Sequence, residues 1–467
     1  MSKSKKNKAA AKVRRIAVLA ALLVVTGAGS AAVIAGYLKN RPSVLEESSS
    51  AVAVTVSEKS ASEVIPAESE TAEEKNETTD DSAPAEEKTE SKADEKKPAE
   101  KTDSSADESK AEKPKENDLP KDESIEAIMD DMTLHEKVCQ MCIVTPEGLT
   151  GYGLVTEAGD ATVSSLSEYP VGGLIYFAQN LVSVDQTKTM INSVQSGNST
   201  VSDIPLFIAV DEEGGGVARC ADQLGTTSFR PMYEYRFDGT DTAYSNAYTI
   251  AQDISALGFN VDFAPVADTW TNPANTVIGT RAYSDDFSEA AKLVASAVKG
   301  FNDGGVICSV KHFPGHGDTS ADSHYGAAAS YQTADELMAG EYLPFKSGIA
   351  AGAEMVMVGH INMVNIDDTP ASVSYTMITG ELRGKLGYDG VVITDSLAMG
   401  AMANYYSSDE IAVKVIQAGG DILLMPYDLA SAVNGVENAV ANGDISEERI
   451  DESVYRILKL KKDRNIL

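Results

Sequence analysis

Eight short apolar segments alternate with amphipathic segments from about residue 120 to the end of the chain, and this alternation restricts the possible folds most strongly. The apolar segments are rich in Val and Ile, and most contain no polar interruption, which is typical of parallel strands covered on both faces. They are 142–145, 171–177, 205–210, 259–264, 306–313, 355–360, 390–395 and 421–426. The pattern therefore predicts an α/β fold, and more specifically a (β/α)8 TIM barrel over residues 119–467 rather than an open sheet.

Helical patterns lie between these predicted strands. In 245–257, for example, apolar residues recur every three or four positions, as on the buried face of a surface helix. Comparable patterns occur at 287–302, 333–351, 409–418 and 428–441. We expect 445–461 to form a closing helix, with no second folded domain after it.

Ionisable residues gather where five of the predicted strands end. Their positions are Asp211-Glu212-Glu213, Asp268, Lys311-His312, His360 and Asp395. The carboxyl ends of barrel strands meet on one face, and that face carries the chemistry in barrel enzymes. The sequence therefore predicts a polar site at this end of the barrel.

The first 118 residues differ in composition from the rest. Residues 1–15 are basic, and 16–37 form an uncharged apolar run of 22 residues, long enough to cross a bilayer as a helix. Lysines before the run predict a cytoplasmic tail, a single-pass membrane anchor and an extracellular body. A signal peptide cleaved near Ala28-Gly29-Ser30, which would leave a secreted protein, is the alternative. Residues 38–118, dominated by Ala, Glu, Lys and Ser, are expected to be a disordered linker.

The formal net charge of −32 argues against nucleic acid as a partner, because phosphate binding requires a basic face. Four scattered cysteines are too few for a disulfide framework. Cys139 and Cys142 have the spacing of half a metal site, but no second Cys/His pair accompanies them. They fit an apolar helix face within 134–143, so we expect core cysteines rather than zinc ligands.

Residues 311–325, KHFPGHGDTSADSHY, contain three of the five histidines. A zinc site would use His312 and His316 as a helical pair, but Pro314 and Gly315 between them predict a loop that leaves a strand. We therefore expect no metal. Asp322-Ser323-His324 instead suggests a catalytic pair, because a nearby carboxylate can orient a histidine that donates and accepts protons.

Asp395 directly follows four apolar strand residues in VVITDSLAMGA. Burying a carboxylate is unfavourable unless it is hydrogen-bonded or functional. An N-cap of the following helix and a catalytic nucleophile are both compatible with this position.

The run KHFPGHGDTSADSH resembles the signature of glycoside hydrolase family 3, in its β-N-acetylhexosaminidase branch. Further similar segments occur in the same order along the body. They are GGLIYFAQNL, DEEGGGVAR, NVDFAPVADTWTNPANTVIGTRAY, AEMVMVGHI, ITDSLAMGA and AGGDILLMP. The resemblance covers about 120–467, and it implies the same (β/α)8 barrel that the strand pattern predicts.

The resemblance also implies roles for particular residues. Asp395 matches the nucleophile, His324 the acid/base and Asp322 its orienting partner. Sugar-binding positions are matched by Asp211, Arg281, Lys311 and His312, with Arg219, Asp268, His316 and His360 at supporting positions around the same subsite. The loop 211–219 departs from the family, since many relatives have Gln at the position of Glu212 and Arg at that of Gly216. We expect this departure to alter selectivity without abolishing sugar binding.

The resemblance implies retaining hydrolysis that releases terminal β-linked N-acetylglucosamine from cell-wall fragments, chitin-like chains or other glycans, without any cofactor. The expected partners are a carbohydrate substrate and a membrane, and the expected oligomeric state is a monomer. A phosphorylase and a β-glucosidase on the same fold remain alternatives. Outside enzymes, a surface-tethered carbohydrate-binding module with an inactive barrel is a further alternative.

Overall fold

The computed structural model describes residues 122–319 and 328–467. The predicted tail, anchor and linker of residues 1–118 lie outside this part of the chain, as do Asp322 and His324. Within the described residues, no helix combines the length and apolar character needed to span a bilayer.

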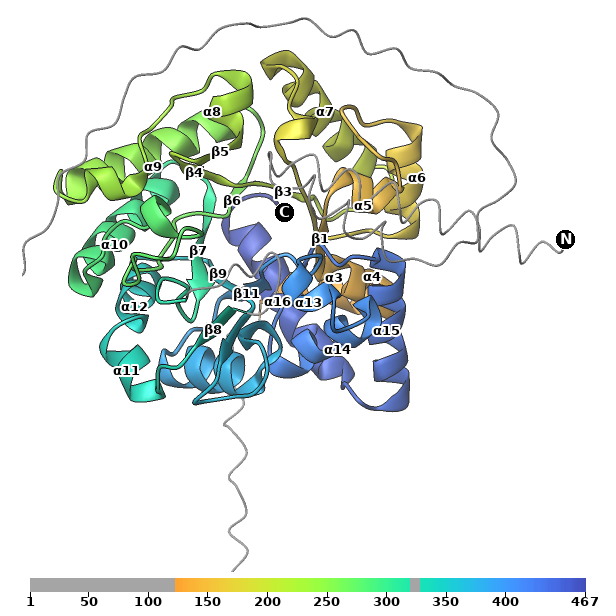
Figure 1. The fold of residues 1–467 in the computed structure, drawn as a ribbon. Coiled ribbons are helices and arrows are strands. Elements are labelled where there is room, and N and C mark those ends of the chain that lie inside the picture. The colour runs from red at the N-terminus through yellow and green to blue at the C-terminus, as the bar shows by residue number, and fades with distance from the viewer. Residues whose placement is uncertain (1–121, 320–327) are drawn as a thin grey trace, which may run out of the picture. The chain divides into compact units, whose positions relative to one another are not determined.

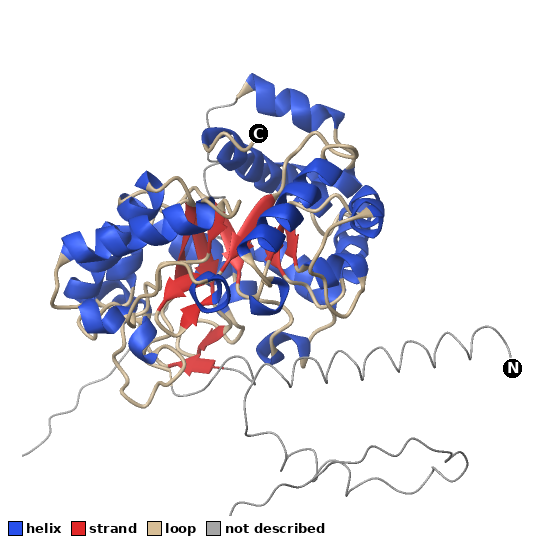
Figure 2. Ribbon diagram, turned by 90° about the horizontal axis from the view of Figure 1, so that it is seen from above, coloured by secondary structure: helices blue, strands red, loops and turns tan. Residues whose placement is uncertain are grey.

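Eight parallel strands form the centre of the structure and occur in sequential order, as the apolar segments predict (Figures 1 and 2). They are β1 (Cys142–Val144), β2 (Gly173–Ile175), β3 (Phe207–Val210), β6 (Val261–Asp262), β7 (Ile307–Phe313), β9 (Met355–Val358), β11 (Val391–Thr394) and β12 (Leu423–Leu424). β1 pairs with both β2 and β12, and a parallel bridge between Ile393 and Ile422 links β11 to the segment before β12. The sheet is therefore a nearly closed barrel.

Helices surround the strands, with the red strands in the middle of Figure 2 and the blue helices outside them. The α-helices are α3 (Glu123–Asp131), α4 (Leu134–Gln140), α5 (Pro146–Thr150), α6 (Asp160–Glu168), α7 (Val184–Asn198), α8 (Arg219–Leu224), α9 (Thr240–Ser255), α10 (Phe287–Asp303), α11 (Ala334–Ala339), α12 (Tyr342–Ala350), α13 (Gly400–Ala403), α14 (Ser408–Ala418), α15 (Leu429–Asn442) and α16 (Glu447–Asp463). Shorter elements are η1 (Ala178–Asn180), η2 (Met232–Tyr235), η3 (Gly279–Arg281), η4 (Ala371–Val373) and the π-helix η5 (Thr376–Lys385). Two small sheets, β4 (Glu212–Gly214) with β5 (Val217–Ala218) and β8 (Ala328–Ser330) with β10 (Ile361–Met363), complete the described elements.

The helix α10 shows why these sequences form helices that pack on the barrel. Asp286 caps it by accepting a hydrogen bond from the backbone N–H of Glu289 at 2.8 Å, which satisfies one of the free donors of the first turn. Its buried residues recur at helical spacing, and they are Ala290, Leu293, Val294, Ala297, Val298, Gly300 and Phe301. The apolar face thus packs inward and the polar face remains in solvent.

Two sequence predictions need correction. The helix expected at 333–351 is divided into α11 and α12, because the backbone of Gly340 leaves the helical region, where a Cβ would collide with the Phe287 ring. The helix face expected for Cys139 and Cys142 is also wrong, because α4 ends at Gln140 and Cys142 begins β1. The prediction of core cysteines is confirmed, since all four are free and buried, and burial raises the pKa of the Cys142 thiol to about 12.

The predicted closing helix is α16, which lies at the amino ends of the strands (Figure 1). Lys461 donates to the carbonyl oxygen of Gly172, immediately before β2, at 2.9 Å. Arg464 pairs with Glu354, immediately before β9. We call this end of the barrel the base and the opposite, carboxyl end the mouth.

The chain also enters the described structure at the base. The backbone N–H of Asp122 donates to the hydroxyl of Tyr455 at 3.0 Å, and its carboxylate accepts from Lys462 at 2.5 Å. Tyr455 and Lys462 both belong to α16. The start of the barrel is therefore attached to the helix that closes the base.

A buried ionic cluster at the base connects α16 to β12. The carboxylate of Asp421 lies 2.6 Å from Arg383 and 3.2 Å from Arg456, and it also accepts from Ser453 at 2.7 Å. Burial opposes ionisation of Asp421, but the arginines outweigh it and hold the pKa of Asp421 below its usual value. Asp421 therefore compensates buried positive charge.

Replacing Asp421 by Asn should lower the free energy of unfolding by about 3–5 kcal/mol, because it leaves buried arginines without their counter-ion. Urea unfolding at pH 7 measures this loss. The matched control is Asp463→Asn, which breaks only an exposed pair with Lys459 and should cost at most about 0.5 kcal/mol. Equal losses in the two variants would contradict the compensating role of Asp421.

Candidate active site

Five neighbouring strands carry the predicted site residues at the mouth, in the order β3, β6, β7, β9 and β11. Asp211 follows β3, Asp268 lies beyond β6, and Lys311-His312 occupies the end of β7. His360 and Asp395 follow β9 and β11. The sequence prediction that these side chains belong to one end of the barrel is confirmed.

An ionic cluster joins two of these positions, Asp211 and Lys311, to Glu213 and Arg281. The ammonium of Lys311, which is 2% exposed, lies 2.8 Å from Asp211 Oδ1 and 2.7 Å from Glu213 Oε1. Arg281 binds both carboxylate oxygens of Glu213, with distances of 2.8 Å from Nε and 2.7 Å from Nη2. Burial disfavours the charged form of Glu213, but the two cations dominate and keep its pKa far below the usual range.

Glu213 is the residue that the sequence analysis did not assign. The sequence does contain a signal for Glu213, since it lies two residues after Asp211 and alternate residues of an extended chain point to the same face. Asp211 and Glu213 accordingly both face Lys311, whereas Glu212 faces α8. The two carboxylates thus hold the ammonium of Lys311 in place.

Glu212 instead caps α8. Its carboxylate accepts from the backbone N–H groups of Cys220 at 2.6 Å and Ala221 at 3.0 Å. Gly214 and Gly215, with φ of 81° and 62°, form the turn that returns the chain to α8, a conformation that favours glycine. Gly216 is exposed, with open space where a Cβ would lie.

Arg219 begins α8 but forms no ion pair within the described part of the chain. Its guanidinium lies over the Phe177 ring, 5.9 Å from the centroid, and its Nε is buried without a hydrogen-bond partner there. A buried donor without an acceptor is unfavourable. Arg219 is therefore suited to receive an acceptor from a ligand.

A second cluster is built around Asp268. This carboxylate accepts from His312 Nδ1 at 2.7 Å and from the backbone N–H of His316 at 2.7 Å. Burial opposes its charge, but His312 and the backbone N–H of His316 outweigh that effect and lower the pKa of Asp268. Asp268 thus joins the end of β7 to the loop that carries His316.

The predicted loop between His312 and His316 is confirmed, because β7 ends at Phe313. Burial lowers the pKa of His316, although the charge of Asp268 and, to a smaller extent, that of Asp395 act in the opposite direction. Its Nδ1 lies 2.7 Å from the Thr319 hydroxyl. Among residues 122–319 and 328–467, no group of three or more His, Cys, Asp or Glu side chains has an arrangement that could hold a metal ion.

Asp395 lies at the mouth beside the end of β9. Its backbone N–H donates to Val358, and its Oδ1 accepts from the N–H of Ser396 at 2.7 Å. The N-cap interpretation is wrong, because the next helix, α13, starts at Gly400 with Met399 as its N-cap. Asp395 therefore lies in the connection between β11 and α13, near His316.

His360 supports the backbone next to Asp395. Its Nε2 donates to the carbonyl oxygen of Ser396 at 2.9 Å, and its Nδ1 lies 2.7 Å from the Ser372 hydroxyl. A carbonyl can only accept, so Nε2 carries a proton. His360 thus fixes the backbone that follows Asp395.

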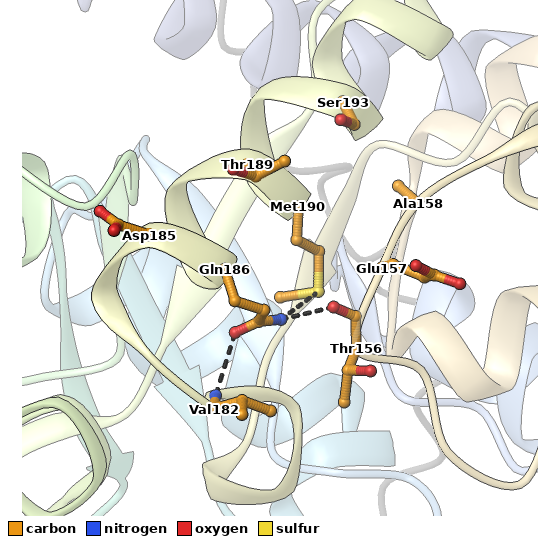
Figure 3. A pocket seen from close by; sticks show the side chains of 9 residues that line it. All are labelled: Thr156, Glu157, Ala158, Val182, Asp185, Gln186, Thr189, Met190 and Ser193. Carbon is orange, nitrogen blue, oxygen red and sulfur yellow. Dashed lines mark hydrogen bonds between the residues drawn. The ribbon is translucent and has the colours of Figure 1, made fainter.

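A separate cavity of about 470 Å³ lies between the loop before α6 and the helix α7 (Figure 3). Gln186 extends across it toward Thr156 and bonds to the backbone N–H of Val182 at 3.0 Å. None of the predicted site residues lines this cavity.

A barrel with a polar cluster at the carboxyl ends of its strands has the arrangement found in barrel enzymes, whose chemistry lies at that end. Residues 133–460 match the family model described as the glycosyl hydrolase family 3 N-terminal domain. The chain belongs to glycoside hydrolase family 3.

Relatives of known name agree with this assignment. The chain is 34% identical over 322 residues to beta-hexosaminidase A of Pseudoalteromonas piscicida, covering 63% of this chain and 54% of that protein. It is 32% identical over 291 residues to a beta-hexosaminidase of Tolumonas auensis, covering 61% and 85%. A solved family 3 beta-N-acetylglucosaminidase from Paenibacillus sp. str. FPU-7 is 38% identical, with a TM-score of 0.68 over 72% of this chain and 63% of that one. The chain thus spans about half the length of the Pseudoalteromonas protein.

The buried position of Glu212 predicts a pH-dependent stability. Burial raises its pKa to about 7, despite the two backbone donors, whereas an unfolded Glu titrates near 4.3. Between these two pH values the folded protein binds more protons than the unfolded protein. The contribution of Glu212 to the free energy of unfolding is therefore fully present below about pH 4.3 and is lost as the pH rises to about 7. Glu212→Gln should gain stability relative to the wild type over this interval.

Urea unfolding of both proteins between pH 4.5 and pH 8 measures this difference. The glutamine has only one acceptor oxygen, so we expect a constant loss of about 1 kcal/mol beneath the pH-dependent gain. Glu123→Gln, at an exposed position of α3, controls for the loss of one carboxylate. A difference between Glu212→Gln and wild type that does not change with pH would contradict the prediction.

Proposed function

We propose that the chain is a retaining β-N-acetylhexosaminidase that releases terminal β-linked N-acetylglucosamine from glycans. The observation that carries this proposal is the position of Asp395 at the mouth, beside the clusters of Lys311 and Asp268. The names of the relatives support N-acetylglucosamine as the released sugar, since these proteins are beta-hexosaminidases and a beta-N-acetylglucosaminidase.

The ionic cluster supplies the groups that hold the terminal sugar. Asp211, Arg281 and Lys311 carry charged acceptors and donors, which form stronger hydrogen bonds to hydroxyl groups than neutral groups do. His312, oriented by Asp268 through Nδ1, directs its Nε2 as a further contact. Arg219 and His316 complete this subsite. Glu213 acts through Lys311 and Arg281, as a positioning residue.

In the first step, Asp395 attacks the anomeric carbon and the bond to the leaving oxygen breaks. His324, as imidazolium with Asp322 as its orienting partner, gives its proton to that oxygen. The usual pair of carboxyl groups is thereby replaced by an Asp and a His. His316, whose pKa burial lowers, is neutral at pH 7 and does not neutralise the Asp395 carboxylate.

In the second step, neutral His324 takes a proton from water, and the hydroxide oxygen displaces Asp395 from the anomeric carbon. Two displacements restore the β configuration. Neither step requires a metal or an organic cofactor.

The proposal includes the place of action. The basic residues before the apolar run 16–37 support a membrane anchor with the barrel outside the cell. Cleavage of that segment would give a secreted enzyme with the same substrates, from environmental or wall-derived glycans.

Asp395→Ala should lower kcat on a chromogenic N-acetylglucosaminide by at least about 10³-fold, because the covalent step disappears. A 5-fluorinated N-acetylglucosaminyl fluoride should label wild-type Asp395, as identified by peptide mass spectrometry. The exposed Asp389, before β11 at the base, provides the control Asp389→Ala, which should retain activity. Turnover like that of the wild type in Asp395→Ala would refute the mechanism.

His324→Ala should lose about 10²–10⁴-fold in kcat on substrates with poor leaving groups. It should lose much less on a dinitrophenyl glycoside, whose leaving oxygen needs no proton, and added azide should yield the β-glycosyl azide. His135→Ala, on the outer helix α4, is the matched control. A loss independent of the leaving group would contradict the acid/base role, and sugar 1-phosphate formed in added phosphate would show phosphorolysis instead.

A further inference from the structure

A cavity of about 470 Å³ lies at the mouth beside β8, apart from the residues assigned above. The side chains that matter here are Asn272, Asp318, Ser330, Tyr331, Gln332 and Glu336. Asn272 lies in the loop after β6, and Asp318 precedes β8. Ser330 ends β8, Tyr331 and Gln332 follow it, and Glu336 lies on α11. The cavity is therefore built from the same two strand-end loops as the Asp268 cluster.

The cavity and the Asp268 cluster share one turn of the chain, Gly315–Thr319. Within this turn, the N–H of His316 donates to Asp268 at 2.7 Å. Asn272, from the same loop as Asp268, donates to the carbonyl oxygens of Asp318 and Thr319 at 3.2 and 3.1 Å. The loop after β6 and this turn thus connect the lining of the cavity to the Asp268 cluster through direct hydrogen bonds.

The wall of the cavity is held by hydrogen bonds. Ser330 Oγ and Gln332 Nε2 donate to Asp318 Oδ2 at 2.6 and 3.0 Å. Gln332 Nε2 also lies 3.3 Å from Oε1 of the buried Glu341. The amide nitrogen of Gln332 thus donates to two carboxyl groups, whereas its amide oxygen accepts no hydrogen bond from the described residues.

Tyr331 supplies an apolar surface next to these polar groups. Its side chain is 69% exposed, and its carbonyl oxygen accepts a hydrogen bond from Asn365, which holds the backbone. Large exposed aromatic rings beside polar groups are typical of ligand sites. A pyranose matches this arrangement, because it presents C–H groups on its face and hydroxyl groups at its edge.

The charge of the cavity restricts the ligand further. The lining contains two acidic residues, Asp318 and Glu336, and no lysine or arginine. Glu336 accepts from the N–H and hydroxyl of Thr333, which lowers the pKa of Glu336 and keeps it charged at pH 7. An anionic ligand would be repelled, and a neutral one would not.

We propose that this cavity binds the sugar on the leaving-group side of the scissile bond, and that it selects an uncharged pyranose over one that carries a carboxylate. The inference rests on the proposed function and narrows it. The second sugar is then a neutral one, as in a chitin-type chain. Hydrolysis adds water across the bond, and the released reducing sugar leaves from the cavity.

Tyr331→Ala tests the aromatic contact with two substrates. N,N′-diacetylchitobiose places a sugar in the cavity, whereas N-acetylglucosaminyl fluoride leaves it empty because the leaving group is one atom. We expect kcat/KM to fall about five- to tenfold on the disaccharide and less than twofold on the fluoride. Tyr248→Ala, on the outer helix α9, should change neither. Equal effects on both substrates, or none, would overturn the inference.

Glu336→Gln tests the charge, and glutamine preserves the cap of α11. The wild type should prefer diacetylchitobiose to N-acetylglucosaminyl-N-acetylmuramic acid, whose second sugar carries a carboxylate. Glu336→Gln should raise kcat/KM for the acidic disaccharide severalfold and leave the neutral one unchanged. The neighbouring, exposed Asp335→Asn is the control and should do neither.

A wild-type preference for the acidic disaccharide would overturn the inference alone, while the proposed function would stand. Failure to release N-acetylglucosamine from any of the three substrates would overturn both. A third outcome would also overturn the proposed subsite. In it, every protein cleaves the fluoride at the wild-type rate, and neither Tyr331→Ala nor Glu336→Gln changes kcat/KM for either disaccharide.

Discussion

The mouth of the barrel depends on the burial of one ammonium group, that of Lys311. Removing a charge from water is unfavourable unless opposite charges and hydrogen bonds replace the lost hydration. Asp211 and Glu213 do this from the loop after β3, and Glu213 extends the pairing to Arg281 from the loop after β6. The position of one lysine on β7 thereby fixes the relative positions of two loops that border the site.

The base of the barrel also contains a buried charge, which there is negative. There a buried carboxylate, Asp421, is surrounded by arginines from η5 and α16. Charge at the mouth and charge at the base are thus both paired within the barrel. Among the described residues, a buried arginine Nε without a hydrogen-bond partner occurs at each end, on Arg219 and on Arg456.

Much of this architecture could be predicted from the sequence, because uninterrupted apolar runs such as 390–395 identify buried parallel strands without any tertiary information. The polar residues at strand ends then locate the site. Tertiary contacts decided the rest. The Phe287 ring leaves no room for a Cβ at Gly340, where the helix breaks, and the role of Glu213 depends on two cations from distant segments. The N-cap interpretation of Asp395 could be rejected only once the start of α13 was known.

The attachment of Asp122 to α16 has a consequence for any surface to which the barrel is fixed. Asp122 lies at the base, beside Tyr455 and Lys462, so a tether that reaches the barrel through this residue pulls on the closed end. The mouth lies at the opposite ends of the strands, so such a tether joins the barrel on the side away from the loops that border the candidate site.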